Sequence, residues 1–394
     1  MNTRANRCIA GVAIAFLVTG VMLSHRVEPG VHVEAVTLAG DTPALKFVPA
    51  DSGPHPVVLL AHGVTGSKEM FFRFGEALAS AGFVCVSVDF PGHGASEQAF
   101  SAAGTVPALE AAAHALGPVD VFIGHSMGAY AGAGAVRDAG LNPRLFIAVG
   151  AIPDLGGHGP PLLLLAGRFE EFATPARLKA RTDARVVISP NSDHAFELYD
   201  GYLVKTAVEA ACAAVGRPSP VSIPNSWRWR LFGMMLALLG AVALALRLPA
   251  FPSRWALMRG PAVWVIVAGA FILCSGTWIG AMPHLRHIPQ QIAVMIVGWL
   301  TITGAARLRL PRWSLVPLTV AVALICAVVG APMPAFFAAL FVLALLAGTL
   351  LGLIADHRGS RRDGDIAMAI HMGYVVGQWL PFPVLAFVKL LLGF

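Results

Sequence analysis

Residues Gly124-His125-Ser126-Met127-Gly128 follow an apolar stretch, Val119 to Ile123, and precede a run of small residues, Ala129 to Ala139. The apolar stretch predicts a buried strand, and the small-residue run predicts a helix. A serine in a Gly-x-Ser-x-Gly pattern at such a turn has its hydroxyl exposed, because the flanking glycines allow close backbone approach. The stretch therefore predicts a nucleophile elbow with Ser126 as the nucleophile.

Two further patterns lie upstream, each at the end of a predicted strand. Pro56 to Leu60 leads into Ala61-His62-Gly63-Val64-Thr65-Gly66-Ser67, and Phe83 to Phe90 ends in Asp89-Phe90-Pro91-Gly92-His93-Gly94-Ala95-Ser96. These stretches resemble the HGxxGS loop and the DxxGHGxS turn of the α/β-hydrolase family. The resemblance implies an α/β-hydrolase fold, which is a doubly wound, mostly parallel sheet. It extends from Val31 to about Val215.

The same resemblance implies an oxyanion hole made of two backbone N–H groups. One N–H belongs to Val64 in the upstream loop, and the other belongs to Met127, the residue after the nucleophile. Each such donor stabilises the oxyanion of a tetrahedral intermediate by about 3 to 4 kcal/mol.

The family order of the catalytic triad is serine, acid and histidine. Arg185 to Ser189 predicts the last strand, and the loop after it contains His194, which we expect to be the general base. Leu162 to Leu165 predicts the preceding strand. Glu170 lies three residues after the glycine that follows this strand, at a position where many family members carry the acid.

The acid has two alternatives. Glu171 is the next residue in the chain, and Asp154 follows the apolar stretch Leu145 to Ile152, where some relatives carry the acid. Each triad residue taken alone also fits a structural role, because serine and histidine cap helices and carboxylates are common in solvated loops. The catalytic interpretation depends on the order of the three residues in the chain and on their common position at strand ends.

Only Pro153 to Pro160 separates two predicted strands where many esterases insert a helical cap, so we expect an open site.

The composition predicts an integral membrane protein. Hydrophobic residues make up 56% of the chain and charged residues 13%, with a mean hydropathy of +0.70. Cys8 to Leu23 is an apolar run behind Arg4 and Arg7, which predicts an uncleaved anchor over residues 1–30. A secretory signal has a similar pattern, but no small-x-small cleavage site precedes Ser24.

The C-terminal part predicts about six further membrane spans. Residues 31–216 form the expected hydrolase domain, 217–228 a linker, and 229–394 an all-α transmembrane bundle. Together with the anchor this gives about seven spans. The apolar segments are Leu231–Leu246, Pro261–Gly280, Ile292–Ala306, Leu315–Gly330, Ala335–Ala355 and Ile366–Leu392.

The distribution of charge predicts the orientation in the membrane. Between Ser24 and Trp227 lie 13 basic and 19 acidic residues, whereas from Arg228 onward there are 13 basic and 3 acidic ones. The basic residues near the spans fall mostly in alternate loops, which indicates a cytoplasmic N-terminus and a hydrolase domain outside the inner membrane, in the periplasm of a bacterium. The high pI of about 9.3 therefore reflects topology and does not indicate nucleic-acid binding.

No cofactor or metal is expected. The sequence has no CxxC, HExxH or nucleotide-binding loop, and the pair His284 and His287 is more typical of a solvated loop than of a metal site. The sequence predicts a serine hydrolase of carboxylic esters or thioesters, with lipids among the candidate substrates. The expected partners are the lipid bilayer and a small-molecule or lipid acyl substrate. Two alternatives are an acyltransferase using the same acyl-enzyme and a transporter or scaffold with an accessory hydrolase-like domain.

Overall fold

The computed structural model describes residues 3–64, 66–98, 101–157, 159–170, 172–194 and 196–245, together with Ile266 and Ala270. The described chain divides into two compact units. The first, His25–Trp229, is called the sheet unit here. The second contains the helix ending at Ser24 and the helical residues from Arg230, and is called the helix-pair unit.

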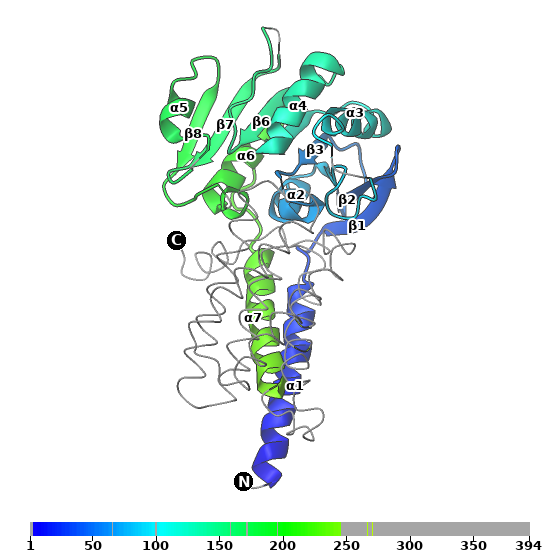
Figure 1. The fold of residues 1–394 in the computed structure, drawn as a ribbon, viewed down its shortest axis with the longest axis vertical. Coiled ribbons are helices and arrows are strands. Elements are labelled where there is room, and N and C mark those ends of the chain that lie inside the picture. Colours follow the sequence, from blue (N-terminus) through cyan, green and yellow to red (C-terminus); the bar gives the residue numbers. More distant parts are fainter. Residues whose placement is uncertain are drawn as a thin grey trace, which may run out of the picture. The chain divides into compact units, whose positions relative to one another are not determined.

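The sheet unit contains one eight-stranded sheet with the order β1-β2-β4-β3-β5-β6-β7-β8 (Figure 1). The strands β1 and β2 pair antiparallel, as do β2 and β4, whereas all other neighbours are parallel. The expected doubly wound, mostly parallel sheet is therefore confirmed. The strands are Val31–Leu38 (β1), Thr42–Pro49 (β2), Val57–Ala61 (β3), Val84–Val88 (β4), Val121–His125 (β5), Leu145–Val149 (β6), Leu162–Gly167 (β7) and Arg185–Ser189 (β8).

Helices cover both faces of this sheet (Figure 1). Helix α2 packs with α6, and α3 packs with α4. The central strands β5 and β6 are buried along their whole length, and every residue except His125 at the end of β5 is apolar, as expected for parallel strands between helices. The helical elements are Lys68–Phe71 (η1), Phe72–Ser80 (α2), Thr105–Leu116 (α3), Met127–Asp138 (α4), Pro175–Lys179 (α5), Glu197–Tyr199 (η2) and Gly201–Ala214 (α6).

The Glu76 carboxylate of α2 is hydrogen-bonded to both the first and the last segment of the sheet unit. Glu76 Oε1 accepts a hydrogen bond from the Glu28 N–H at 2.9 Å, and Glu76 Oε2 accepts one from Ser226 Oγ at 2.5 Å. The Arg73 guanidinium lies 4.3 Å from the ring centroid of Trp227. Both ends of the unit are thus attached to the helix that follows the loop after β3.

The helix-pair unit consists of α1 (Thr3–Ser24) and the part of α7 (Ser226–Ala245) that begins at Arg230. The two helices are in backbone contact. A Cβ on Gly20 would lie 2.3 Å from the Ala237 nitrogen, and one on Gly240 would lie 2.5 Å from the Ala13 carbonyl oxygen. Small residues at these positions permit the close approach, as in many transmembrane helix pairs.

Within the described residues, one helix is long and apolar enough to cross a membrane. This helix is Ser226–Leu244, with 19 residues, and Cys8–Ser24 is a shorter apolar helix. Core helices of soluble proteins and signal sequences have the same length and composition. Helix α7 begins inside the linker expected at 217–228. The other predicted spans, from residue 246 onward, lie outside the described residues, apart from Ile266 and Ala270.

Candidate active site

Ser126 lies at a sharp turn between β5 and α4. Its backbone has φ of 49° and ψ of −119°, a conformation that costs a residue with a side chain about 1 to 3 kcal/mol. The Ser126 N–H donates to the Val149 carbonyl of β6, and the Ser126 carbonyl accepts from Ala129 N in α4. These bonds hold the strained turn, so the expected nucleophile elbow has the geometry that the sequence implies.

The glycine at the end of the elbow motif is required by backbone packing. A Cβ on Gly128 would lie 2.1 Å from the carbonyl oxygen of Ala61 and 2.6 Å from that of His62. Both atoms belong to the end of β3 and the loop after it, which has little freedom to move. The contact places α4 directly against the loop that carries Val64.

Gly128→Ala is therefore expected to destabilise the sheet unit by about 3 kcal/mol or more, since backbone atoms would have to separate. For a unit of this size the apparent Tm would fall by about 6 to 12 °C. Thermal unfolding of the full-length protein in detergent measures this shift. Gly134→Ala on the same helix is the matched control, because the nearest atom to its Cβ would be a side-chain atom, the Val106 Cγ2 methyl group at 2.7 Å, and not a backbone oxygen. Equal Tm values for the two variants would contradict this account.

His194 connects Ser126 to Glu170. The His194 Nε2 atom lies 3.1 Å from Ser126 Oγ, and His194 Nδ1 lies 2.7 Å from Glu170 Oε2. The three residues follow β5, β7 and β8, so each lies at the carboxyl end of a parallel strand. The structure thus connects the expected nucleophile, base and acid by two consecutive hydrogen bonds.

The Glu170 carboxylate is buried and well supplied with hydrogen bonds. Its Oε1 accepts from the N–H groups of Phe172 and Ala173, at 2.7 and 2.8 Å. Burial alone would raise the pKa of Glu170, but the hydrogen bond and the charge of His194 and the Ala173 N–H lower it below its usual value. Glu170 is therefore ionised at neutral pH and accepts the Nδ1–H of His194.

The two alternative acids differ in their position. Asp154 is exposed, and its Oδ1 accepts from the Gly156 N–H two residues along the chain at 3.0 Å. No hydrogen bond joins Asp154 to His194 within the described residues, so the structure does not bring this alternative into the site. Glu171 lies outside the described residues.

The loop after β3 lies against the elbow. A Cβ on Gly63 would lie 3.1 Å from the Cβ of Ser126, which places the neighbouring Val64 beside the nucleophile. Met127 is the first residue of α4, so its N–H has no acceptor within the helix. Both expected oxyanion donors are therefore near Ser126, although Thr65, next to Val64, lies outside the described residues.

A buried ion cluster fixes the same loop to the turn after β4. The Lys68 ammonium bonds to Asp89 Oδ2 at 2.7 Å and to Glu69 Oε1 at 3.0 Å. Asp89 also accepts the N–H groups of Lys68 and Ala95. Burial, partly offset by Lys68 and reinforced by Glu69, raises the pKa of Asp89 to about 6. This burial was not predicted, because charged residues in glycine-rich loops are usually solvated.

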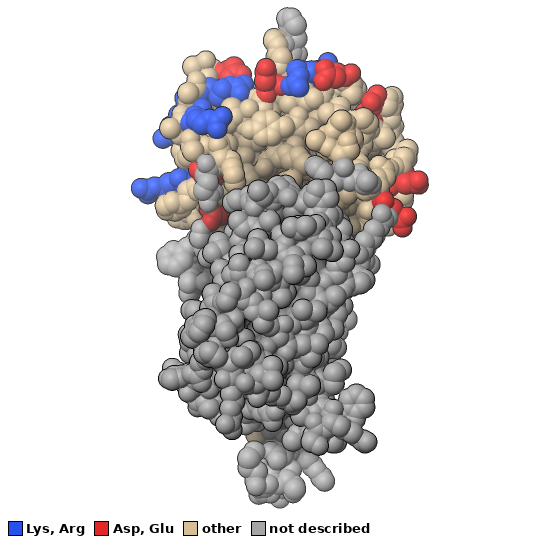
Figure 2. Space-filling view, viewed as in Figure 1, with Lys and Arg blue, Asp and Glu red and all other residues tan. Residues whose placement is uncertain are grey.

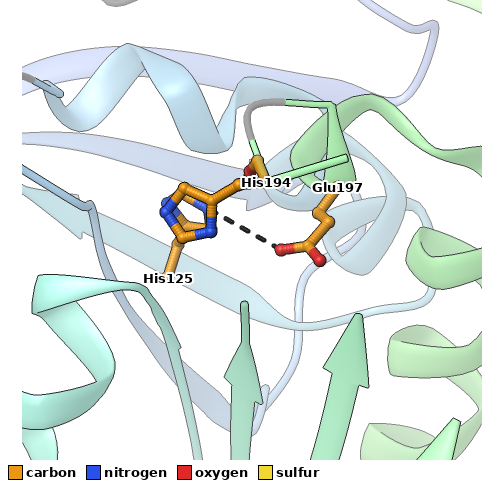
Figure 3. Close-up of side chains that lie close together, drawn as sticks. All are labelled: His125, His194 and Glu197. Atoms are coloured by element: carbon orange, nitrogen blue, oxygen red, sulfur yellow. Dashed lines mark hydrogen bonds and ion pairs between the residues drawn. The ribbon is translucent and has the colours of Figure 1, made fainter. Parts of the chain in front are cut away.

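Two more buried groups adjoin His194 and were not assigned a chemical role from the sequence. Glu197 is fully buried, and its Oε2 lies 3.9 Å from His125 Nε2 (Figure 3). The His125 ring lies 4.7 Å from the His194 ring, and His125 Nε2 is 3.0 Å from the His194 carbonyl oxygen. Burial and the nearby His194 lower the pKa of His125 to about 3, so His125 is neutral and donates through Nε2.

Within the described residues, one group of side chains is spaced closely enough to hold a metal ion. Its members are His125, His194 and Glu197, with ligand atoms within 4.8 Å of one another. Both ring nitrogens of His194 are engaged by hydrogen bonds to Glu170 and Ser126, and His125 Nε2 bonds to a carbonyl oxygen. We therefore assign no metal to these residues. His284 and His287 lie outside the described residues.

Exposed apolar side chains border the site. The Phe172 side chain is 58% exposed, and its ring contacts the His194 ring edge-on at 4.7 Å. Val64 is 42% exposed. Phe172 is thus in direct ring contact with His194. Val64 follows Gly63, where a Cβ would lie 3.1 Å from the Cβ of Ser126. Apolar side chains are therefore exposed close to Ser126 and His194.

Comparison with known proteins identifies the fold. A family model described as alpha/beta hydrolase fold matches residues 56–139, which include the loop after β3 and the elbow. Together with the strand order, this match identifies the sheet unit as an α/β-hydrolase fold. No curated protein matches the sequence.

Solved structures with a similar fold cover about half of this chain. An esterase of M. tuberculosis is 16% identical, with a TM-score of 0.39, and the match covers 52% of this chain and 98% of that one. A membrane phospholipase A, a bacterial virulence factor, is 14% identical with a TM-score of 0.39, covering 54% and 93%. A Paleococcus ferrophilus monoacylglycerol lipase is 15% identical with a TM-score of 0.36, covering 46% and 99%.

Proposed function

We propose that this protein is a serine hydrolase that cleaves carboxylic esters or thioesters through an acyl-enzyme on Ser126. The observation that carries the proposal is the continuous chain of hydrogen bonds from Ser126 Oγ through His194 to Glu170. A serine hydroxyl bonded to an imidazole whose other nitrogen faces a buried carboxylate is the arrangement that activates serine for acyl transfer.

The proposed reaction has two halves. Ser126 Oγ attacks the acyl carbonyl while His194 Nε2 takes the hydroxyl proton, and the N–H groups of Val64 and Met127 stabilise the oxyanion. His194 then returns the proton to the leaving alcohol or thiol. In the second half, His194 removes a proton from water, which attacks the acyl-enzyme and releases the acid. Glu170 accepts the Nδ1–H of His194 throughout and stabilises the imidazolium.

The surroundings of the site favour an acyl group of apolar character. Phe172 and Val64 expose apolar surface beside the nucleophile. Figure 2 shows that charged side chains of both signs lie mostly along the rim of the described surface. Apolar contact contributes about 25 cal/mol for each Å² removed from water, so longer acyl chains are expected to lower KM.

We further propose that the protein is integral to a bacterial inner membrane, with its N-terminus in the cytoplasm and its hydrolase domain in the periplasm. Helix α1 supports this proposal, because it exposes large apolar side chains in place of charged ones. Small residues at its contact with α7 are also typical of membrane helices. The exposed apolar residues of α1 are Ile9, Val12, Ile14, Phe16, Val18 and Met22.

A labelling experiment tests the proposed function. A fluorophosphonate probe, which reacts with activated serines, is expected to label the full-length protein in detergent at Ser126, and peptide mapping identifies the site. Ser126→Ala should abolish the labelling, whereas Ser101→Ala, an exposed serine distant in sequence from the motif, should preserve it. Folded wild-type protein that takes up no label would reject the proposal.

A screen of esters and thioesters with increasing acyl chain length then defines the substrate. Parallel reactions with and without acceptor alcohols separate hydrolysis from acyl transfer, because only transfer yields a new ester. We expect free acid as the main product in both cases.

A further inference from the structure

The carboxyl groups of Glu197 and Glu170 adjoin the same imidazole and interact with each other. Glu170 Oε2 lies 2.7 Å from His194 Nδ1, and a Glu197 carboxyl oxygen lies within 4.8 Å of a His194 ring nitrogen. Two buried carboxylates in contact repel each other strongly, so one of them retains a proton. Glu170 accepts three N–H groups, from Phe172, Ala173 and His194. Glu197 accepts one N–H, that of Gly167 at 2.7 Å, and no N–H or O–H donor contacts its Oε2 within the described residues. Glu170 has more hydrogen-bond donors to stabilise a negative charge, so it is the ionised member of the pair. The shared proton therefore resides on Glu197.

Among the described residues, no cationic side chain contacts Glu197. His125 of β5 is neutral, because burial lowers its pKa to about 3 and its buried Nδ1 has no hydrogen-bond partner within the described residues. Its Nε2 lies 3.9 Å from Glu197 Oε2 and adds no positive charge there (Figure 3). Asp193, in the loop before η2, is a further negative group. Burial first, and then the charge of Glu170, raise the pKa of Glu197 well above its usual value.

The backbone is shaped to admit the Glu197 carboxyl. Gly150, just after β6, has a φ of +60°, a conformation that favours glycine. A Cβ there would lie 2.3 Å from Glu197 Oε2 and 2.9 Å from His194 Nδ1. The Glu197 carboxyl therefore lies close to the imidazole edge that faces Glu170.

We propose that Glu197 is a positioning residue, a neutral carboxylic acid that donates a hydrogen bond to Glu170 and keeps that carboxylate ionised and directed at His194. An ionised carboxyl group has four acceptor positions, and the Glu197 O–H occupies the one that the three N–H groups leave free. This inference rests on the proposed serine hydrolase function, since Glu197 acts only through Glu170.

Two variants of the full-length protein test the inference. Glu197→Gln keeps a neutral side chain of the same shape with an N–H donor, whereas Glu197→Met keeps the length and removes the donor. We expect Glu197→Met to lower kcat about tenfold with little change in KM, because a hydrogen bond to a charged group is lost. Glu197→Gln should restore most of this loss.

The pH profile of kcat/KM distinguishes positioning from a merely structural role. Without the donor, Glu170 directs more of its negative charge at His194, which stabilises the imidazolium. The acidic limb, which reports protonation of His194, should therefore move up by about half a pH unit or more for Glu197→Met. Glu197→Gln should leave this limb in place.

Two results would overturn the inference. A shift of the acidic limb to lower pH in Glu197→Gln would mean that an anion had been removed, since a carboxylate favours protonation of a nearby imidazole. Equal kinetics for both variants and the wild type would mean that the hydrogen bond is irrelevant. If Glu197→Met does not fold, the Glu197→Gln profile alone still decides the charge state. Failure of the proposed function is distinct, because the wild type itself would then show no Ser126-dependent turnover.

Discussion

Ser126→Ala is expected to lower kcat for ester hydrolysis by about 10⁶-fold while leaving the fold intact. Alanine removes only the hydroxyl oxygen, and the small methyl side chain fits the same turn. The remaining donors of Val64 and Met127 can still polarise a carbonyl, so a residual rate above that of water is expected. Initial rates with a chromogenic ester of short chain measure the loss.

The matched control for this variant is the exposed Ser101→Ala, which should retain the wild-type rate. Thermal unfolding should give a Tm for Ser126→Ala at or slightly above that of the wild type. A loss of less than about 100-fold with an intact fold would show that another group is the nucleophile, because a lost triad serine costs far more.

Glu170→Gln is expected to lower kcat by about 10⁴-fold, because the amide cannot stabilise the imidazolium and favours the wrong tautomer of His194. The amide N–H₂ group would face His194 Nδ1 or the N–H groups of Phe172 and Ala173, where an acceptor is needed. KM should change little, since the loss appears in the transition state. Steady-state kinetics with one ester substrate separates the two constants.

Asp154→Asn is the control for the acid, because Asp154 is the alternative that sequence order allows. Its side chain caps a local turn at Gly156, so near wild-type kinetics are expected. The assignment of the acid to Glu170 would be wrong if Asp154→Asn lost activity and Glu170→Gln retained it.

The fold of the sheet unit was largely predictable because each parallel strand is a short apolar run followed by a glycine-rich or polar loop. The predicted strand Arg185 to Ser189 agrees with β8 to the residue. Other strands, such as β6, end before the apolar run does. Ile152 continues that run but lies in the loop, where its N–H bonds to the Tyr130 hydroxyl. Apolar loops over a core cannot be distinguished from strand ends by hydropathy alone.

The site was predictable where it follows chain order at strand ends, as Ser126, His194 and Glu170 do. Glu197 was not assigned, because its significance depends on Gly150 and Glu170, which are distant in sequence and meet it only in the folded sheet. The buried Lys68 and Asp89 were not foreseen for the same reason. Hydropathy patterns report which face is apolar, but they do not report which charged pairs are enclosed by loops.

In chain order, the sheet unit is inserted between helices α1 and α7, and the Glu76 carboxylate holds its two ends close together. Its entering segment at Glu28 and its leaving segment at Ser226 both bond to this one side chain. A domain whose ends converge in this way can be exchanged between hosts, because the host needs only two attachment points that are close together. We therefore expect that the sheet unit could be grafted onto another pair of helices without rearrangement of its strands.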